Sequence, residues 1–517
     1  MTNMRIKRRF FLAVALLLTM SVQGQETKNH NLEVAKNLDI FNQLYKNLDL
    51  MYVDTLDANK VIGTGIRAML RSLDPYTEYF SEQKELKTFI SGKYAGIGAL
   101  IRYHLGQKTV VVDEPYAGTP AQETGLQKGD VILSIDDSVM TGKDTKYVSE
   151  RLRGDAGTTF LLKIRRPSTG KEMKLKITRR QIQYTPTIPY YGMREGNTGY
   201  ISLSQFTEGC AQEVRRAFVD LRNQGMKSLV LDLRGNGGGS EMEAVNLVNM
   251  FVARGLTVVS NKGKIRQVSH DYKTTMEPLD TVMPLVVLVN GESASASEIT
   301  SGALQDLKRA KIIGTRTYGK GLVQVPIDLP YNTNVKITTS RYYLPSGRCI
   351  QGTGIEPDMT VKLDTLPNIA YYLAGSGVDS TEVTFDYVVD YISKHPTIAK
   401  PSDFHISDAD FADFKERVLK SGFTYDPVSK KQLEELVKTA KFEGYYEDAR
   451  QAFEQLEEKL KHDISRDIDR HADVLRQMLE SDIIAAYYYQ SGVLEAGLRY
   501  DKQLQEALRV LSEATKQ

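Results

Sequence analysis

This sequence is poor in the residues that most often bind metals or form cross-links. Its 517 residues include only two cysteines, Cys210 and Cys349, and seven scattered histidines. The chain has no CxxC and no HExxH motif, which argues against a zinc site. The two cysteines could pair with each other, but they cannot form a disulfide framework.

The sequence also has almost no net charge and no long apolar run beyond its N-terminus. The formal charge is +2, with no long basic run in the mature region, which argues against a dedicated nucleic-acid-binding protein. The apolar segment FFLAVALLLTMSV follows several basic residues and is short for a membrane span. With Val22 and Gly24 at a plausible cleavage site, residues 1–24 are expected to be a signal peptide that exports the protein to a periplasm or outside the cell. An uncleaved membrane anchor is the alternative.

The length leaves room for more than one domain, and the residue pattern changes along the chain. Residues 25–90 have helical periodicity, and residues 91–183 have short strand-like runs separated by Gly, Asp and Pro turns. Apolar strands alternate with helices over residues 184–363, and charged amphipathic helices fill residues 364–517. This pattern predicts a multidomain α/β protein with a helical N-terminal segment, a β-rich module, an α/β core with a largely parallel sheet, and a helical C-terminal domain.

The β-rich module carries the glycine loop YAGIGALI, followed by TPAQETGLQKGDVILSIDD. These segments resemble a PDZ domain. In that family the backbone N–H groups of the loop hold the carboxylate of a chain terminus, and the neighbouring strand pairs with the peptide. The resemblance places Gly96, Ile97, Gly98 and Ala99 in a substrate-binding loop. A glycine-rich hairpin in another small β domain is the alternative.

A serine flanked by alanines, Ser295, lies at the centre of GESASASEI. The apolar strand PLVVLVN precedes this segment and a helix pattern follows it, so the serine is expected at a strand-to-helix turn. The helix N-terminus offers free N–H groups and partial positive charge, which favour a developing oxyanion. A serine that only caps the helix is the alternative.

A lysine boxed by glycines, Lys320, follows 25 residues after Ser295 in TYGKGLVQ. That separation fits one helix and one strand, so the two side chains can return to the same place. A desolvated lysine can be neutral and can take the proton of a hydroxyl. The same segment begins like a phosphate-binding loop, but Gly321 stands where Ser or Thr would hold magnesium, and a strand pattern follows instead of a helix.

The third glycine-rich segment is LVLDLRGNGGG. It could be a dinucleotide-binding loop, although no acidic residue that would bind a ribose is evident at the expected distance. The alternative is an oxyanion loop whose N–H groups face a substrate carbonyl.

Taken together, LDLRGNGGG, NGESASASEI and RTYGKGLVQ, in this order behind a PDZ-like module, resemble the C-terminal processing peptidases, also called tail-specific proteases. LDPYTEYF and RYYLPSGRCIQGTGIEPD extend the resemblance over residues 35–363. It implies a ClpP/crotonase-like α/β peptidase core and acyl transfer that needs no metal or other cofactor. Cys349 stands where relatives often have serine, and we interpret it as a tolerated substitution because no histidine lies near it in sequence.

The resemblance also assigns roles to individual residues. It implies Ser295 as the nucleophile, Lys320 as the general base and Gln324 as the residue that orients the lysine. It implies the N–H groups of Ala296 and of one glycine in the GNGGG segment, most plainly Gly238, as the oxyanion hole.

The function implied is a serine endopeptidase that cleaves proteins or peptides near their C-termini, with the PDZ domain engaging the substrate terminus. An activating or adaptor protein and self-association through the C-terminal helices are further expectations, and nucleic acid is not an expected partner. A non-catalytic peptide-binding scaffold and a nucleotide-dependent enzyme are the alternatives. The complete set of Ser295, Lys320 and Gln324 disfavours the scaffold, and Gly321 disfavours the nucleotide enzyme.

Overall fold

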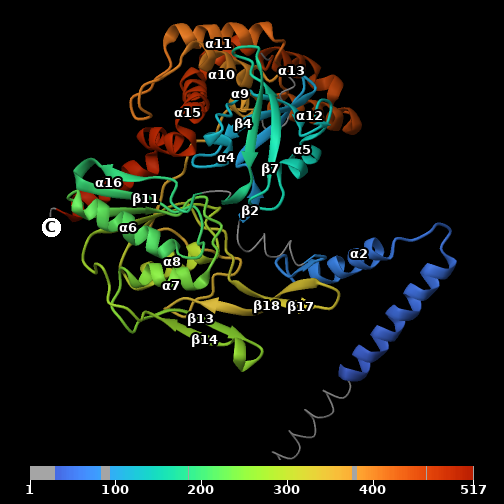
Figure 1. Ribbon diagram of the computed structural model, residues 1–517, viewed down its shortest axis with the longest axis vertical. Coiled ribbons are helices and arrows are strands. Elements are labelled where there is room, and N and C mark those ends of the chain that lie inside the picture. Colours follow the sequence, from blue (N-terminus) through green and yellow to red (C-terminus); the bar gives the residue numbers. More distant parts are fainter. Residues whose placement is uncertain (1–29, 83–92, 184–185, 375–380, 462, 516–517) are drawn as a thin grey trace, which may run out of the picture. The chain divides into compact units, whose positions relative to one another are not determined.

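The computed structural model describes residues 30–82, 93–183, 186–374, 381–461 and 463–515 (Figure 1). The expected signal peptide lies outside these ranges. Within them, no helix combines the length and the apolar character that crossing a bilayer requires. The chain divides into one unit of Met1–Gln83 with Val325–Thr338, and a second of Lys84–Gln324 with Thr339–Gln517.

The first unit is mainly helical, as expected for the N-terminal segment. It contains a helix over residues 30–51, helix α2 (Ala58–Arg71) and strand β1 (Glu78–Phe80). Helix α2 begins where the side chain of Asp57 accepts a hydrogen bond from the Lys60 N–H, which satisfies one of the free donors of the first turn. Strand β1 pairs antiparallel with the part of strand β18 (Thr333–Tyr343) that belongs to the same unit.

The PDZ module is a six-stranded sheet with two helices, and it opens the second unit. Its sheet has the order β3-β4-β5-β7-β8, with β6 beside β5, and β2 pairs separately with β9. Both helices overlap the sequence segments TPAQETGL and KYVSERLRG, whose residue patterns predict a short helix each. In chain order the elements are β2 (Lys93–Gly96), β3 (Ala99–His104), β4 (Thr109–Pro115), α4 (Pro120–Glu123), β5 (Val131–Ile135), β6 (Ser138–Val139), α5 (Thr145–Leu152), β7 (Thr159–Arg165), β8 (Glu172–Thr178) and β9 (Arg180–Gln183).

The α/β core is built on a second six-stranded sheet of order β10-β11-β12-β15-β16-β19. All neighbouring strands in it are parallel except β10, which runs antiparallel to β11. This agrees with the predicted parallel sheet. The elements are β10 (Tyr191–Arg194), β11 (Thr198–Ser202), α6 (Cys210–Asn223), β12 (Ser228–Asp232), α7 (Glu241–Asn249), β13 (Thr257–Gly263), β14 (His270–Lys273), β15 (Leu285–Val289), α8 (Ala296–Asp306), β16 (Lys311–Gly314), β17 (Leu322–Leu329), β18 (Thr333–Tyr343) and β19 (Met359–Thr360), with short 3-10 turns at Glu195–Asn197 and Arg266–Val268.

Helices cover both faces of this sheet, which explains the unbroken apolar runs of its strands. In β12 every residue is buried. Leu229 and Leu231 face the helices α6, α7 and α8, whereas Val230 between them faces the opposite layer. That opposite layer is the last helix of the chain, α16 (Lys502–Ala514).

Five of the remaining C-terminal helices, those within residues 368–420 and 464–497, pack around their own core, which includes Phe414, Leu475 and Ile483. They also contact the PDZ module: Val111 and Val131 of that module pack with Phe385 and Val389. The C-terminal helices before α16 are α9 (Asn368–Leu373), α10 (Val383–Lys394), α11 (Asp408–Lys420), α12 (Val428–Glu443), α13 (Tyr446–Lys459), α14 (Ile464–Arg470) and α15 (Ala472–Gly497), followed by a 3-10 turn at Leu498–Tyr500.

Candidate active site

The turn between β15 and α8 sets Ser295 apart from the two serines beside it. Ser293 and Ser297 are completely buried, whereas Ser295 is partly exposed. The Ser293 hydroxyl donates to the carbonyl of Leu233 at 2.8 Å, and the Ser297 hydroxyl donates to the carbonyl of Asn236 at 2.8 Å. These two hydroxyls therefore fix the backbone of the neighbouring loop. Of the three serines, Ser295 is the one that a substrate can reach.

The backbone at Ser295 is strained. Its φ is 57° and its ψ is −114°, a combination that residues with a Cβ rarely adopt. Such a conformation costs on the order of 1–3 kcal/mol and persists only where the surroundings enforce it. Here Ser295 is the N-cap of α8, directly before the N–H groups of the first helical turn.

A buried carboxylate, Glu298, joins the serine turn to the lysine loop. One of its oxygens, Oε2, accepts the N–H of Ser295 and the N–H of Lys320, each at 2.8 Å. The other, Oε1, accepts the N–H of Gly319 at 2.7 Å and the hydroxyl of Thr317 at 2.6 Å. Because one oxygen binds both N–H groups, the backbones of Ser295 and Lys320 lie side by side.

Burial raises the pKa of Glu298, and the hydrogen bonds from Thr317 and from the N–H groups of Lys320, Ser295 and Gly319 oppose that rise. Glu298 is not among the site residues expected from the sequence. The pattern that could have found it is the serine followed three positions later by a glutamate at a helix start, which is a capping-box signature.

The lysine loop is held from its other side by Tyr342 of β18. The Tyr342 N–H donates to the carbonyl of Gly321 at 3.1 Å, and its hydroxyl donates to the carbonyl of Lys320. The side-chain oxygen of Gln351 accepts the Gly321 N–H at 2.8 Å. Lys320 is partly exposed, and Gln324 lies four residues further on in β17, also partly exposed.

The glycine loop after β12 lies against the serine turn. A Cβ on Gly238 would come within 2.7 Å of the Ser295 Cβ and 3.0 Å of the Ala296 nitrogen. Glycine is therefore required at this position, where φ is also 102°. Ala296 is the first residue of α8, and its N–H has no protein acceptor within the described ranges.

The Gly238 N–H is already engaged inside the loop. It donates to the side-chain oxygen of Asn236 at 2.9 Å, and the Asn236 amide in turn donates to the carbonyl of Leu203 at 2.8 Å. The carbonyl of Asn236 accepts the N–H of Ala294 at 3.0 Å. Asn236, which is completely buried, thus fixes both the loop and the serine turn, and the sequence analysis did not single it out.

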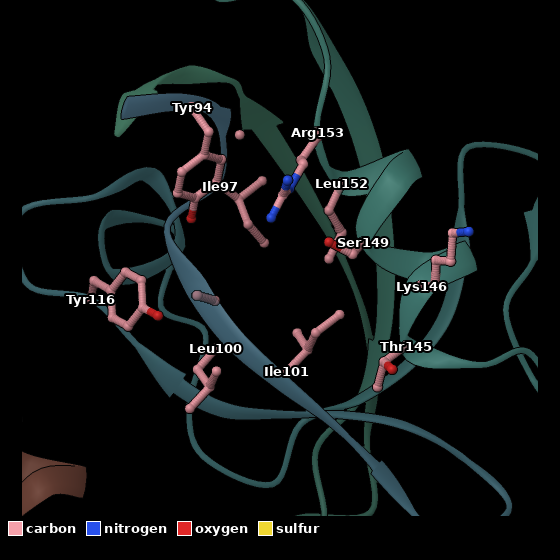
Figure 2. A pocket seen from close by; sticks show the side chains of 12 residues that line it. Tyr94, Ile97, Leu100, Ile101, Tyr116, Thr145, Lys146, Ser149, Leu152 and Arg153 are labelled. Carbon is pink, nitrogen blue, oxygen red and sulfur yellow. The ribbon is translucent and has the colours of Figure 1, made fainter. Parts of the chain in front are cut away.

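The loop Gly96–Ala99 of the PDZ module borders a groove of about 340 Å³ (Figure 2). In Figure 2, Ile97, Ile101 and Leu152 project into this space, Leu100 lines its edge, and the guanidinium of Arg153 lies beside the ring of Tyr94. The groove runs between strand β3 and helix α5, and its other lining residues are Gly96, Ala99, Tyr116, Thr145, Lys146 and Ser149.

The carbonyl groups of Ile97 and Gly98 in the PDZ loop accept hydrogen bonds from within the module. The carbonyl of Ile97 accepts the Ala121 N–H at 2.9 Å, and the carbonyl of Gly98 accepts the Tyr116 N–H at 2.8 Å and the Thr119 hydroxyl at 2.9 Å. For the N–H groups of Ile97 and Gly98, the described part of the chain offers no acceptor. This loop has the polarity that binding of a carboxylate requires.

Three segments of the chain match known protein families. Residues 111–166 match the PDZ domain family, and residues 197–361 match peptidase family S41. Residues 369–511 match the family described as "Probable PDZ-protease, C-terminal helical domain".

Known proteins resemble the chain over most of its length. It is 36% identical over 361 residues to a carboxy-terminal-processing protease of Bartonella bacilliformis, and the aligned region covers 68% of this chain and 82% of that protein. It is 32% identical over 374 residues to a probable CtpA-like serine protease of Staphylococcus epidermidis, which covers 70% of this chain and 74% of that one. Among solved structures, the photosystem II D1 C-terminal processing protease is similar with 31% identity and a TM-score of 0.39, over 65% of this chain and 92% of that one. The Bartonella alignment, together with the matches to the PDZ and peptidase family models, shows that the chain is a PDZ-containing member of the carboxy-terminal-processing proteases of peptidase family S41.

Proposed function

We propose that this protein is an exported serine endopeptidase that cleaves proteins or peptides near their C-termini, with Ser295 as nucleophile and Lys320 as general base. The observation that carries the pairing is the carboxylate of Glu298, which binds the N–H groups of both residues through one oxygen. The partial exposure of Ser295 between two buried serines supports it as the attacking group. Export rests on the sequence pattern of residues 1–24.

The proposed reaction is acyl transfer through protein groups. Lys320, in its uncharged form, takes the proton of the Ser295 hydroxyl while the serine oxygen attacks the scissile carbonyl. The lysine then gives that proton to the leaving amine, and an acyl-enzyme remains. Water, deprotonated by the same lysine, attacks the ester and releases the new C-terminus. Gln324 orients the lysine.

The tetrahedral intermediate carries negative charge on its oxygen, and N–H groups stabilise that charge. We assign the Ala296 N–H to this role together with the Gly238 N–H. The second donor then has to turn from the Asn236 side chain to the oxyanion, or donate to both, because Asn236 accepts it at 2.9 Å in this structure.

We assign the PDZ groove to the C-terminus of the substrate. Its loop of Gly96, Ile97, Gly98 and Ala99 presents N–H groups for the terminal carboxylate, and the apolar walls fit an apolar last residue. Adaptor proteins and self-association through the C-terminal helices stay predictions from the sequence.

The decisive experiment is labelling and cleavage by the full mature chain. A serine-reactive phosphonate should label the wild type, and Ser295→Ala should lose both labelling and cleavage of an unstructured peptide while keeping its melting temperature. Ser301→Ala is the matched control, because its hydroxyl donates to a helix carbonyl in the same helix. Retained cleavage by Ser295→Ala would contradict the proposal, and intact peptide binding without any cleavage by the wild type would favour the scaffold.

A further inference from the structure

The last helix of the chain forms one layer of the peptidase core. Helix α16 packs its apolar side on the sheet face opposite to α6, α7 and α8, and this contact buries Tyr200, Val230, Val286, Leu288, Ile313, Leu504, Ala507 and Leu511. The peptidase sheet is therefore completed by residues that follow the C-terminal helical domain in sequence.

Asp501, the N-cap residue of α16, binds Arg234, which belongs to the segment LVLDLRGNGGG. The carboxylate of Asp501 accepts Nη1 of Arg234 at 3.0 Å and Nη2 at 2.5 Å. The same carboxylate caps α16, since Oδ1 accepts the N–H groups of Gln503 and Leu504 at 3.0 Å each. Gln503 adds a further bond, from Arg234 Nη1 to its side-chain oxygen at 2.9 Å.

Arg234 connects this helix cap to the loop beside the nucleophile. Its guanidinium also binds Asp232, the last residue of β12, through Nε at 2.9 Å. Asp232 in turn accepts the hydroxyl of the buried Tyr200 at 2.7 Å. Arg234 immediately precedes the GNGGG segment and lies two residues before Asn236, the residue that holds the Gly238 N–H.

Both ends of this ion pair are shielded from solvent. The side chain of Arg234 is 15% exposed and that of Asp501 is 11% exposed. Without the Asp501 charge, Asp232 is the one carboxylate left of the two that bind Arg234, and both Nη groups lose an acceptor. Because unpaired donors of a shielded guanidinium are costly, Arg234 is expected to shift towards Asp232 or to recruit water. Because the backbone of Arg234 leads into the loop, such a movement shifts the loop.

We propose that Asp501 is a positioning residue of the peptidase: through Arg234 it sets the arrangement of the Gly235–Gly239 loop against Ser295. The proposal rests on the proposed function of this loop as an oxyanion hole. Asp501 would then support the active site, although it lies 267 residues from Arg234 in sequence.

The test is Asp501→Asn in the full mature chain. Asparagine is as good a helix cap as aspartate, so the substitution removes the charge and spares the cap. Since loss of one oxyanion donor lowers kcat by about 100–1000-fold, we expect an indirect displacement of the loop to lower kcat by roughly tenfold or more, with KM for an unstructured peptide changed less than about twofold. The control is Lys502→Ala, which removes the neighbouring exposed ion pair to Asp364 and should leave kcat unchanged.

Two further variants separate positioning from stability. Leu511→Ala loosens the packing of α16 without touching Arg234, so it should lower the melting temperature and leave kcat unchanged at a temperature where the variant is folded. In a double-mutant cycle, Asp501→Asn should have little further effect on kcat once Arg234→Gln is present.

Wild-type kcat in Asp501→Asn, or additive effects in the cycle, would overturn the proposal. So would an equal fall of kcat in Leu511→Ala. These outcomes are distinguishable from failure of the proposed function, which would show itself as cleavage by Ser295→Ala.

Discussion

Two glycine loops in this chain present backbone N–H groups, one in the PDZ module and one beside Ser295, and they are supported in different ways. The PDZ loop is held by its immediate neighbours, because its carbonyls bind Tyr116, Thr119 and Ala121, all within about two dozen residues. The peptidase loop is held by buried side chains from distant parts of the chain, Ser293 and Asp501 among them. The loop that we propose for the substrate C-terminus is thus held locally, whereas the loop beside Ser295 is held by contacts that depend on the tertiary structure.

The largest effect should come from Gly238→Ala. The added Cβ would meet backbone and the Ser295 Cβ at 2.7 Å, at a φ of 102°. Since the proposed oxyanion site and the proposed nucleophile would both be displaced, we expect kcat to fall by at least about a hundredfold, measured on an unstructured peptide.

The neighbouring glycine is the control for this variant. A Cβ on Gly237 would meet nothing within 4 Å, so Gly237→Ala should retain most of the activity. Equal losses in the two variants would mean that the loop is sensitive to any side chain rather than to the contact with Ser295.

The next effect should come from Glu298→Gln. The amide keeps one acceptor oxygen and replaces the other with an NH₂ group. One donor pair therefore loses its acceptor, either the N–H groups of Ser295 and Lys320 or the Gly319 N–H with the Thr317 hydroxyl, and the link between the serine turn and the lysine loop is weakened. We expect kcat to fall by roughly 10–100-fold with a smaller change in KM. The matched control is Glu292→Gln, an exposed carboxylate of the same turn, which should behave as wild type.

In the PDZ loop, Gly98→Ala should change binding rather than chemistry. Its Cβ would lie 2.4 Å from the Thr119 Cβ at a φ of 77°. We expect KM for a peptide with a free apolar C-terminus to rise by about tenfold, with kcat on a short peptide unchanged. Gly106→Ala, where a Cβ would make only ordinary contacts, is the control. A large fall in kcat on the short peptide would show that the PDZ loop is coupled to the active site after all.

The smallest effect concerns pH and the contact between the PDZ module and the C-terminal helices. The ring of His104 lies 2.9 Å from Asp386 and 2.9 Å from Glu382, with Arg102 nearby. The hydrogen bond to Asp386 raises the pKa of His104 against the opposing effects of burial and Arg102, and the charges of Asp386 and Glu382 add to the rise.

A histidine whose pKa is raised on folding contributes stability that is complete below its unfolded pKa, about 6.5, and is lost as the pH rises through the folded pKa. The melting temperature should therefore be lower at pH 8 than at pH 6. In hydrogen-exchange measurements, β3 and α10 should likewise be less protected at pH 8 than at pH 6. This dependence should flatten in His104→Gln and persist in the exposed control His270→Gln. The same slope in wild type and His104→Gln would assign the effect to another group.

The sequence predicted the modules and their chemistry through short contiguous patterns. Each of these patterns can be recognised within about ten residues: the glycine loop and the two helices of the PDZ module, the alternation of buried strands and helices, and the three peptidase motifs. Glu298 was within reach of the same reasoning, because its spacing from Ser295 is that of a capping box.

Other features could not be read from the sequence. The pattern places α16 among amphipathic helices with no expected chemistry, and no local signal distinguishes its cap, Asp501, from other capping aspartates. Asn236 is likewise one polar residue in a glycine run until its side chain is seen to bridge Leu203 and Gly238.

What the sequence by itself determined are the features that depend on residue type and short spacing: an apolar strand, a helix start, a glycine where φ must be positive, a serine and a lysine in glycine- and alanine-rich surroundings. What only the tertiary structure decided is which backbone groups are already satisfied. Hydrogen bonds and buried charges pair groups that are close in space, and Asp501 is close to Arg234 because the last helix covers the second face of the sheet.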